Sequence, residues 1–366
     1  MTLHVSVGPG QYIRKPFLLE EIGSYIKSFG EKVLAIGGET ALSVSIEQMI
    51  TGLTIENLEL LDSVAYGGNC SWSNIQKLIE KIEELKPDVL LAVGGGTAID
   101  TVKAVGYATN LPIIAIPTIA ATCAATTSIS ILYDDEGTFI EISRKSKAPN
   151  LVLVDTAIIK NAPYRFLAAG IGDTLAKWFE SKASIQKAVP NALNRTAVKI
   201  AEELYQMLLE QGPSALEALK KGKDDPAIDD VIDSIILVSG SVSGYGGDDC
   251  RTAAAHAIYS GLTIFPEIHE TYHGEIVAFG ILAQLVLEGK TEEEILNLVS
   301  FYEKVDLPSS LAAMNLHELS DQQWKELGEV TVTIEDMDNM PFEVTPKMVI
   351  EAVKTADMIG RKAVKQ

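Results

Sequence analysis

The sequence predicts an α/β domain followed by an all-α domain, and two observations support this fold class. Over the first 155 residues, short apolar runs alternate with amphipathic stretches, which is the rhythm of a parallel sheet with helical crossovers. After Pro163 the apolar residues recur at helical spacing almost to the end of the chain. A chain of 366 residues can form two or three domains, each with its own core. We therefore expect one domain at residues 1–160 and another at residues 161–366.

The elements of the first domain follow from its apolar runs. Buried strands are predicted at residues 33–36, 58–61, 89–93, 113–116 and 151–155, with helices between the earlier ones and the last strand closing the sheet. Residues 128–133 and 138–142 flank an acidic turn and predict a hairpin. In the helical half, loops are expected at the Gly-Pro pair 212–213 and at residues 222–226.

Glycines follow two of the predicted strands, at Gly37-Gly38 and at Gly94-Gly95-Gly96. Ligands of open α/β sheets bind at these carboxyl ends of the strands. The triple glycine leads into a helix, so backbone amides and the positive end of the helix dipole are available to an anionic cofactor. The segment is neither GxGxxG nor a Walker A loop, because no Gly-Lys-Ser/Thr follows. A tight strand-to-helix turn without a ligand is the alternative.

Three of the five histidines fall between residues 256 and 273, beside small-residue helical sequence. His256 and His273 with Asp173 would form a two-imidazole, one-carboxylate set that suits Zn²⁺ or Fe²⁺ and leaves a position for substrate. Spacing alone leaves the alternative that the histidines are core residues and that Asp173 is a helix N-cap. The three side chains belong to the helical half and the glycine turns to the α/β half. We therefore expect the active site in a cleft between the two domains.

Composition limits the partners and the compartment. A net charge of −20 disfavours nucleic acid, because an acidic surface repels the phosphate backbone. Three distant cysteines form neither a disulfide framework nor a metal knuckle, which fits a reducing cytoplasm. Residues 107–133 are uncharged, but Pro112 and Pro117 argue against a membrane helix, and residues 1–5 lack a signal-peptide core. We expect a cytoplasmic protein with no nucleic-acid or membrane partner.

In combination, these motifs resemble the iron-containing alcohol dehydrogenase superfamily, specifically its glycerol dehydrogenase branch. The resemblance covers nearly the whole chain and rests on residues 8–12, 94–96 with Asp100 and Lys103, 117–120, 134–137, 169–173, 254–257 and 273–275. It implies a Rossmann-like nucleotide-binding domain and a helical metal-binding domain, the dehydroquinate synthase-like fold. It also implies NAD or NADP, one divalent metal per subunit (zinc or iron), a small-molecule substrate and a homo-oligomer.

The resemblance also assigns site residues. The metal ligands, which would also contact substrate, are Asp173, His256 and His273. The dinucleotide contacts are Gly38, Gly95, Gly96, Thr97, Ala98, Ile99, Asp100, Thr118, Ile119, Ala120, Ala121, Thr127, Ile129 and Tyr133. His269 lies one helical turn before His273 if that segment is helical, and it is then a candidate proton relay; a surface histidine is the alternative.

Two departures from the glycerol dehydrogenase pattern bear on specificity. The family's Gly-Asp pair after the first predicted strand is Gly37-Gly38 here, which makes NADP possible, while the adjacent Glu39 leaves NAD open. The glycerol-binding aspartate is replaced by Cys123, in a segment similar to the hydroxycarboxylate dehydrogenase A branch, whose members reduce 2-oxo acids. An uncharged Cys123 suits a carboxylate substrate; a buried packing cysteine is the alternative.

We therefore expect a metal-dependent, NAD(P)-linked oxidoreductase that interconverts a small 2-oxo acid or ketone and its 2-hydroxy acid or alcohol. Oxidation of glycerol to dihydroxyacetone is the first alternative. A dehydroquinate synthase-like lyase is another, although it needs cations for a phosphorylated substrate where the matching segments here are apolar or neutral. A noncatalytic nucleotide-binding module is a third, and bound metal would argue against it.

Overall fold

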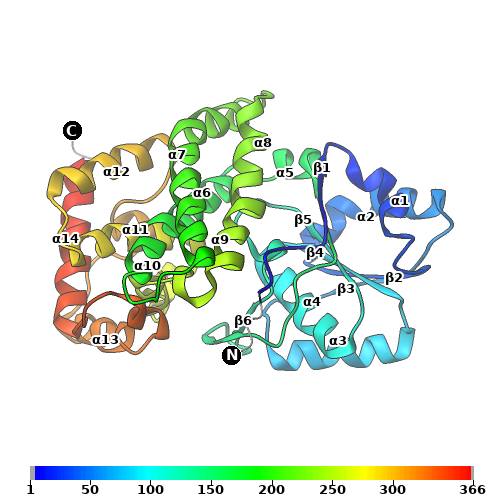
Figure 1. Ribbon diagram of the computed structural model, residues 1–366, viewed down its shortest axis with the longest axis horizontal. Coiled ribbons are helices and arrows are strands. Elements are labelled where there is room, and N and C mark those ends of the chain that lie inside the picture. Colours follow the sequence, from blue (N-terminus) through cyan, green and yellow to red (C-terminus); the bar gives the residue numbers. More distant parts are fainter. Residues whose placement is uncertain (1–4, 364–366) are drawn as a thin grey trace. The chain divides into compact units, whose positions relative to one another are not determined.

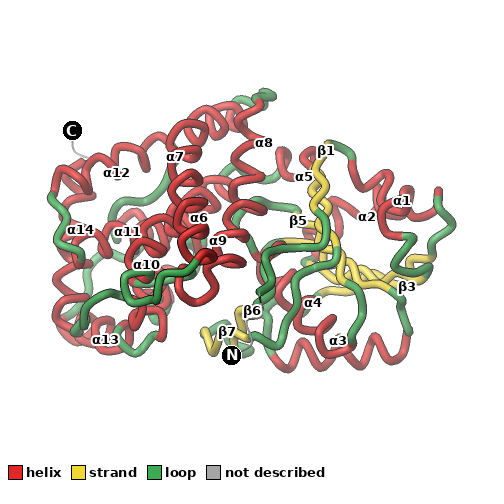
Figure 2. The backbone as a smooth tube through the Cα atoms, in the orientation of Figure 1, coloured by secondary structure: helices red, strands yellow, loops and turns green. Residues whose placement is uncertain are grey.

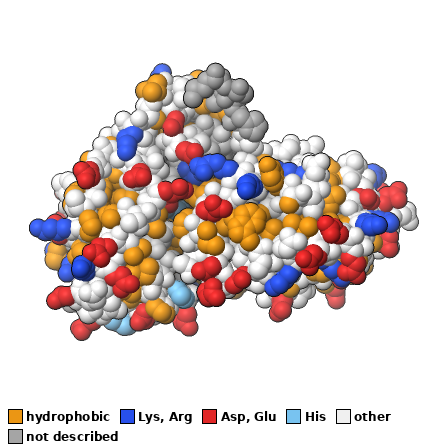
Figure 3. Space-filling view, turned by 90° about the horizontal axis from the view of Figure 1, so that it is seen from below, with side chains coloured by type: hydrophobic (Ala, Val, Ile, Leu, Met, Phe, Trp, Pro, Cys, Tyr) orange, Lys and Arg blue, Asp and Glu red, His pale blue; other side chains and the backbone are white. Residues whose placement is uncertain are grey.

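The computed structural model describes residues 5–363, and these divide into two compact units, one ending at Pro163 and the other beginning at Tyr164 (Figure 1). Residues 1–4, with His4 and most of the segment considered as a signal peptide, lie outside the described residues. No helix within the described range is both long enough and apolar enough to cross a membrane. Figure 3 shows acidic side chains spread over the visible face, consistent with 50 acidic against 30 basic residues.

The first unit is built on a parallel six-stranded sheet with the order β1-β8-β5-β4-β2-β3 (Figure 2). Its strands are β1 (Tyr12–Lys15), β2 (Lys32–Gly37), β3 (Glu59–Ala65), β4 (Val89–Gly94), β5 (Ile113–Pro117) and β8 (Leu151–Asp155). Its longer helices are α2 (Glu39–Ile55), α3 (Trp72–Leu85) and α4 (Gly96–Thr109), with η1 (Leu18–Glu21), α1 (Ile22–Ile26), η2 (Ala124–Thr126) and α5 (Thr156–Asn161) as shorter pieces. Strands β4, β5 and β8 are buried throughout, as expected for a sheet covered on both faces.

Two details of the sheet differ from the sequence prediction. Strand β1 was not predicted, because its Tyr-Ile-Arg-Lys sequence is only half-buried and lacks an apolar run. Strand β8 does not close the sheet, because it pairs with β5 on one side and with β1 on the other. The edge is therefore taken by a strand from the very start of the unit.

The predicted hairpin is present as β6 (Ser130–Tyr133) and β7 (Phe139–Ser143), an antiparallel pair separate from the main sheet. Its acidic turn is attached to the start of α3. Asp135 accepts hydrogen bonds from Ser71, at 2.6 Å between Oγ and Oδ1, and from Ser73. Ser71 is also the N-cap of α3 and accepts from the amide of Asn74, so one short segment anchors both the helix and the turn.

All the regular secondary structure of the second unit, within its described residues, is helical. Its helices are α6 (Arg165–Ser184), α7 (Ala192–Lys220), α8 (Pro226–Asp233), α9 (Ser239–Gly246), α10 (Ala254–Leu262), α11 (His273–Leu287), α12 (Glu292–Lys304), α13 (Asp321–Thr331) and α14 (Pro346–Ala363). A π-helix, η3 (Ser234–Val238), joins α8 to α9, and 3-10 turns form η4 (Gly247–Cys250), η5 (Pro266–Ile268), η6 (Ala312–Met314) and η7 (Glu335–Asn339). Helix α11 is buried over most of its length and packs against α6, α10 and α14, so it is the centre of this unit.

One predicted loop of the helical unit is wrong. Helix α7 continues through Gly212 and Pro213 and ends only at Lys220. Its buried stripe runs on both sides of the proline, with Leu208 before it and Leu216 after it. Burial of that stripe outweighs the backbone hydrogen bond that Pro213 removes. The loop predicted at residues 222–226 is present, with Gly222 at φ 59° and α8 beginning at Pro226.

Candidate metal centre

Three helices bring the predicted ligands together. Asp173 lies on α6, His256 on α10, and His273 is the first residue of α11. Asp173 Oδ1 is 3.3 Å from His256 Nε2 and 3.2 Å from His273 Nε2. One ligand atom from each side chain lies within 4.8 Å of the others, and this is the group found at metal-sharing distance among the described residues.

Two glycines allow the helices to approach this closely. A Cβ atom on Gly274 would stand 1.8 Å from the carbonyl oxygen of Ala169, and one on Gly172 would stand 2.3 Å from that of Gly274. Neither position can carry a side chain while α6 and α11 keep this contact. The glycines therefore place the residues that follow Gly172 and precede Gly274, namely Asp173 and His273, beside each other.

The electrostatics favour a charged cluster. Burial alone would raise the pKa of Asp173, but hydrogen bonds from His256 and His273 outweigh it and hold that pKa well below its ordinary value. Burial would lower the pKa of His256, yet the charge of Glu180 and the hydrogen bonds to Asp173 and Glu180 raise it to about 10. Asp173 lies inside α6, which excludes the N-cap alternative for this residue. A buried carboxylate facing two imidazoles fits a divalent ion of the zinc or iron type.

A glutamate that the sequence analysis did not consider supports this cluster. Glu180 is fully buried, and its Oε2 lies 2.6 Å from His256 Nδ1. It follows Asp173 by seven residues, which is two helical turns and therefore the same face of α6. That spacing is the sequence signal that could have identified it.

The start of α11 is held by a second carboxylate. Glu275 Oε2 accepts from the amide of Tyr272 at 2.7 Å and so caps the helix. Arg165, at the start of α6, contacts both oxygens of Glu275, at 2.6 and 2.8 Å, and lies over the Tyr272 ring. These contacts fix the first turn of α11, where His273 lies.

His269 does not satisfy the condition under which it was considered. It is the C-cap of η5, and a turn rather than a helix connects it to α11. The side chain is exposed, and its Nε2 donates to the carbonyl oxygen of Thr263 at 3.1 Å. The helical spacing that suggested a proton relay is therefore absent, and the relay keeps no structural support.

In the first unit, the ends of three neighbouring strands meet at the glycine turn. The amide of Gly38, after β2, donates to Val93 in β4, and the amide of Thr118, after β5, donates to Gly94. Gly94 has φ 144°, a conformation that side chains rarely adopt, and Gly95 is the N-cap of α4. The side chain of Ile119 lies directly beside Gly95, where an added Cβ would be 3.0 Å away. The predicted strand, triple-glycine turn and helix are thus all present.

A buried ion pair organises the loop behind this turn. Lys103 Nζ lies 2.8 Å from Asp100 Oδ1, and it donates to the carbonyl oxygens of Ala124, Thr127 and Ile129 and to the Thr127 hydroxyl. Asp100 Oδ2 accepts from the amide of Ile131 at 2.9 Å. Burial raises the pKa of Asp100 in spite of the Lys103 charge. The structure therefore gives Asp100, Thr127 and Ile129 internal contacts, and their contact with a dinucleotide stays a prediction.

The remaining predicted residues also fall in the first unit. At the start of α4, Thr97 is half-buried, and Ala98 and Ile99 are buried. After β5, Ala120 is buried and Ala121 is half-buried. Tyr133 is the last residue of β6. Cys123 is 8% exposed and precedes η2, where its carbonyl oxygen accepts from Thr126. The predicted metal and dinucleotide residues thus belong to different units, and their meeting in one cleft stays a prediction.

A parallel sheet with a glycine turn and a helical unit with a two-histidine, one-aspartate cluster define a nucleotide- and metal-dependent enzyme. The family model described as iron-containing alcohol dehydrogenase matches residues 9–156. Glycerol dehydrogenase from Citrobacter freundii is 36% identical over 98% of this chain and 99% of its own length. Hydroxycarboxylate dehydrogenase A from Escherichia coli K12 is 32% identical over 97% of this chain and 98% of its own.

The fold comparison agrees with these matches. The crystal structure of glycerol dehydrogenase from Schizosaccharomyces pombe superposes with a TM-score of 0.90 at 29% identity, over 100% of this chain and 93% of that one. The chain belongs to the iron-containing alcohol dehydrogenase family. It is an NAD(P)-dependent metal oxidoreductase, as the sequence resemblance predicted.

Proposed function

We propose that this enzyme interconverts a small 2-oxo acid and its 2-hydroxy acid. The observation that carries this substrate class is Cys123, a nearly buried, uncharged residue at the position where the glycerol dehydrogenase pattern has an aspartate. An aspartate would repel a carboxylate substrate across a short and poorly screened distance, whereas a thiol does not. Glycerol oxidation is the second candidate, and the 36% identity to a glycerol dehydrogenase favours it.

The metal would be held by Asp173, His256 and His273, because the three donors converge and one of them is a buried carboxylate. A bound zinc or iron ion supplies a Lewis acid for the substrate's hydroxyl or carbonyl oxygen. The protein side chains hold that position: Asp173 contributes the charge, while Glu180 and Glu275 fix His256 and the helix start that bears His273. The His273 side chain is 34% accessible to solvent, so a small molecule could reach the proposed metal position from this side.

The dinucleotide would be bound by the glycine turn at the start of α4. The turn offers backbone amides without side chains at Gly95 and Gly96, and it lies at a helix N-terminus, which attracts a pyrophosphate. A nicotinamide dinucleotide supplies or accepts the hydride. We infer that NADP is accepted as well as NAD, because Gly38 presents no carboxylate to a 2′-phosphate. A homo-oligomer remains the expected assembly, measurable by light scattering.

The experiment that tests the function is a substrate panel with metal analysis. Reduction of 2-oxo acids and ketones with NADH and NADPH is compared with oxidation of glycerol and other diols, using protein of known metal content. We expect a 2-oxo acid to give the highest kcat/KM. Efficient glycerol oxidation with weak 2-oxo acid reduction would return the assignment to glycerol dehydrogenase.

A matched set of variants tests the metal ligands. Asp173→Ala, His256→Ala and His273→Ala are each expected to lose metal and activity while still binding dinucleotide, because the glycine turn lies in the other unit. His317→Ala, a histidine outside the cluster, serves as the control and is expected to keep both. Full metal occupancy and activity in all three ligand variants would contradict the assignment.

A further inference from the structure

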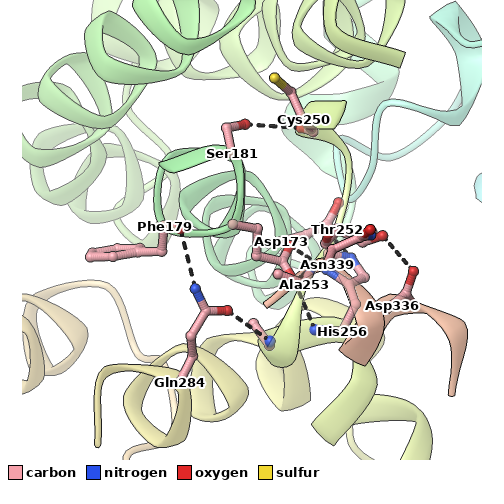
Figure 4. A network of polar contacts seen from close by, with 12 residues as sticks. Asp173, Phe179, Ser181, Cys250, Thr252, Ala253, His256, Gln284, Asp336 and Asn339 are labelled. Carbon is pink, nitrogen blue, oxygen red and sulfur yellow. Dashed lines mark hydrogen bonds and ion pairs between the residues drawn. The ribbon is translucent and has the colours of Figure 1, made fainter. Parts of the chain in front are cut away.

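One face of α6 carries both a proposed metal ligand and a row of groups that hold the segment before α10 (Figure 4). Ser184 Oγ donates to the carbonyl oxygen of Asp249 at 2.7 Å, and Ser181 Oγ donates to that of Cys250 at 2.9 Å. Glu180 continues the row, because its Oε1 accepts from the amides of Ala253 at 2.7 Å and His256 at 3.0 Å. The residues of this row are two or three turns from Asp173 on the same helix.

Both oxygens of Glu180 are committed to this segment. While Oε1 accepts from the two backbone amides, Oε2 lies 2.6 Å from His256 Nδ1. A carboxylate can only accept, so the proton of this hydrogen bond must lie on Nδ1. The other ring nitrogen, Nε2, faces Asp173, and it becomes a ligand atom when it gives up its own proton to a metal, because the remaining ring proton is held on Nδ1.

We propose that Glu180 is the positioning residue of the metal centre: it fixes the orientation of His256 and keeps its proton on Nδ1, so that Nε2 is available as a ligand. This inference rests on the metal site proposed above. A ligand histidine whose outer nitrogen is held in this way binds metal more strongly than one that is free to rotate or change tautomer. Glu180 thus acts through His256 and does not itself contact the metal position.

The segment that carries His256 has further attachments that do not involve Glu180. Gln284 Oε1 accepts from the amide of Ala255 at 3.0 Å, and its Nε2 donates to the carbonyl oxygen of Phe179 at 3.2 Å. Thr252 donates to Asp336, and Asn339 donates to the Thr252 carbonyl at 2.9 Å (Figure 4). A change at Glu180 therefore leaves the backbone of this segment anchored, which allows the role of its carboxylate to be tested in a folded protein.

Glu180→Gln separates the two roles of the carboxylate. The glutamine oxygen can replace Oε1 as acceptor for the two backbone amides, which turns its NH₂ group toward His256 Nδ1. Two N–H groups cannot share one hydrogen bond, so His256 must move its proton to Nε2, on the metal side. We expect the affinity for Zn²⁺ to fall tenfold to a hundredfold, measured by competition with a chromophoric chelator.

Asp336→Asn is the matched control. It makes the same carboxylate-to-amide change within the same buried network, but Asp336 hydrogen-bonds to Thr252 and interacts with His256 only through its charge, without holding a ring nitrogen. Its zinc affinity is expected to stay near that of the unmodified protein. A loss as large as that of Glu180→Gln would overturn the proposal, because it would show that any damage to the network weakens the site.

A second measurement reads the proton directly and needs no variant to fold. In the Co²⁺-loaded unmodified protein, proton NMR should show a hyperfine-shifted imidazole N–H that exchanges slowly with water, because Glu180 buries and binds it. Glu180→Gln at saturating Co²⁺ should lack this signal. Absence of the signal in the unmodified protein, or its persistence with unchanged affinity in the variant, would overturn the proposal. Failure of the unmodified protein to bind Zn²⁺ or Co²⁺ would contradict the metal site itself.

Discussion

At Gly38 the structure has room for a side chain, although the residue is a glycine. Its φ of −74° and ψ of 148° are open to any residue, and an added Cβ would meet only the Tyr66 ring, at 3.7 Å. The absence of a side chain is therefore not required by the fold. This makes the position a clean place to test how the enzyme discriminates between its two candidate cofactors.

Gly38→Asp is expected to shift the preference toward NADH by about tenfold, or about 1.4 kcal/mol of differential binding. The new carboxylate would accept from ribose hydroxyls and repel a 2′-phosphate. Fluorescence titration with NADH and NADPH measures the shift, and Gly38→Asn, which has the same shape without the charge, should show much less of it. If the unmodified enzyme does not bind NADPH at all, another group such as Glu39 excludes the phosphate and our argument fails.

Cys123→Asp is expected to raise kcat/KM for glycerol and lower it for an anionic substrate. A hydrogen bond to a charged partner contributes about 1.5–3 kcal/mol, enough to change a preference by one or two orders of magnitude. Both rates are compared at equal metal content, with Cys123→Ser as the neutral control. Equal loss of both activities in the aspartate variant would show that Cys123 is a packing residue.

On the scale of elements, Lys103 connects helix α4 to η2 and to the loop at residues 127–129. Its ammonium group neutralises Asp100 and binds the carbonyl oxygens of Ala124, Thr127 and Ile129. The loop follows the segment that contains Thr118 and Cys123. Its conformation therefore depends on one fully buried cation.

Lys103→Met is expected to destabilise the α/β unit by about 3–5 kcal/mol, because it leaves Asp100 as an unpaired buried charge. It should also weaken dinucleotide binding by releasing the loop. Urea denaturation and cofactor titration measure the two effects. The double variant with Asp100→Asn should recover part of the stability, since no charge is then left unpaired, and an unchanged single variant would contradict this account.

The sequence predicted best those elements whose burial shows in their own residues. Strands β2, β4, β5 and β8 were predicted because continuous apolar runs mark strands covered on both faces. Strand β1 was not predicted, because pairing at the edge of a sheet requires no apolar run. A loop was wrongly predicted within α7, because Gly212-Pro213 is a local stop signal that helix packing overrides. In both cases the deciding contacts come from distant parts of the chain.

The same reasoning divides the candidate site. Asp173, His256 and His273 could be proposed from residue type and a family resemblance, because few side chains suit a metal. Glu180 was missed: its spacing of seven residues from Asp173 places it on the same helix face, but its contact with His256, 76 residues away, arises only when α6 and α10 pack. The helical spacing expected between His269 and His273 is absent, because a turn precedes α11, and the relay role of His269 stays a prediction.

On the scale of the whole molecule, the proposed metal ligands and dinucleotide residues lie in different compact units, so we expect each cofactor to stabilise its own unit. Zn²⁺ should stabilise the helical unit and NAD(P)H the α/β unit, each by about 2.7 kcal/mol at a hundredfold excess over its Kd. Hydrogen-exchange mass spectrometry should show metal-dependent protection in α6, α10 and α11, and dinucleotide-dependent protection around residues 94–97. A chelator should reverse the first effect alone. Metal-dependent protection confined to the sheet would contradict the assignment of the ligands.

The distance between the ligands along the chain has a consequence for how the enzyme acquires its ion. His273 follows Asp173 by 100 residues, so the three proposed ligands come together only when α6, α10 and α11 pack. We therefore expect metal uptake to require the folded helical unit. Two imidazoles and one carboxylate are borderline donors that accept several divalent ions, so we expect the metal found in a purified sample to record the supply in the producing cell. Batches grown on zinc-rich and iron-rich media should differ in turnover while sharing one structure.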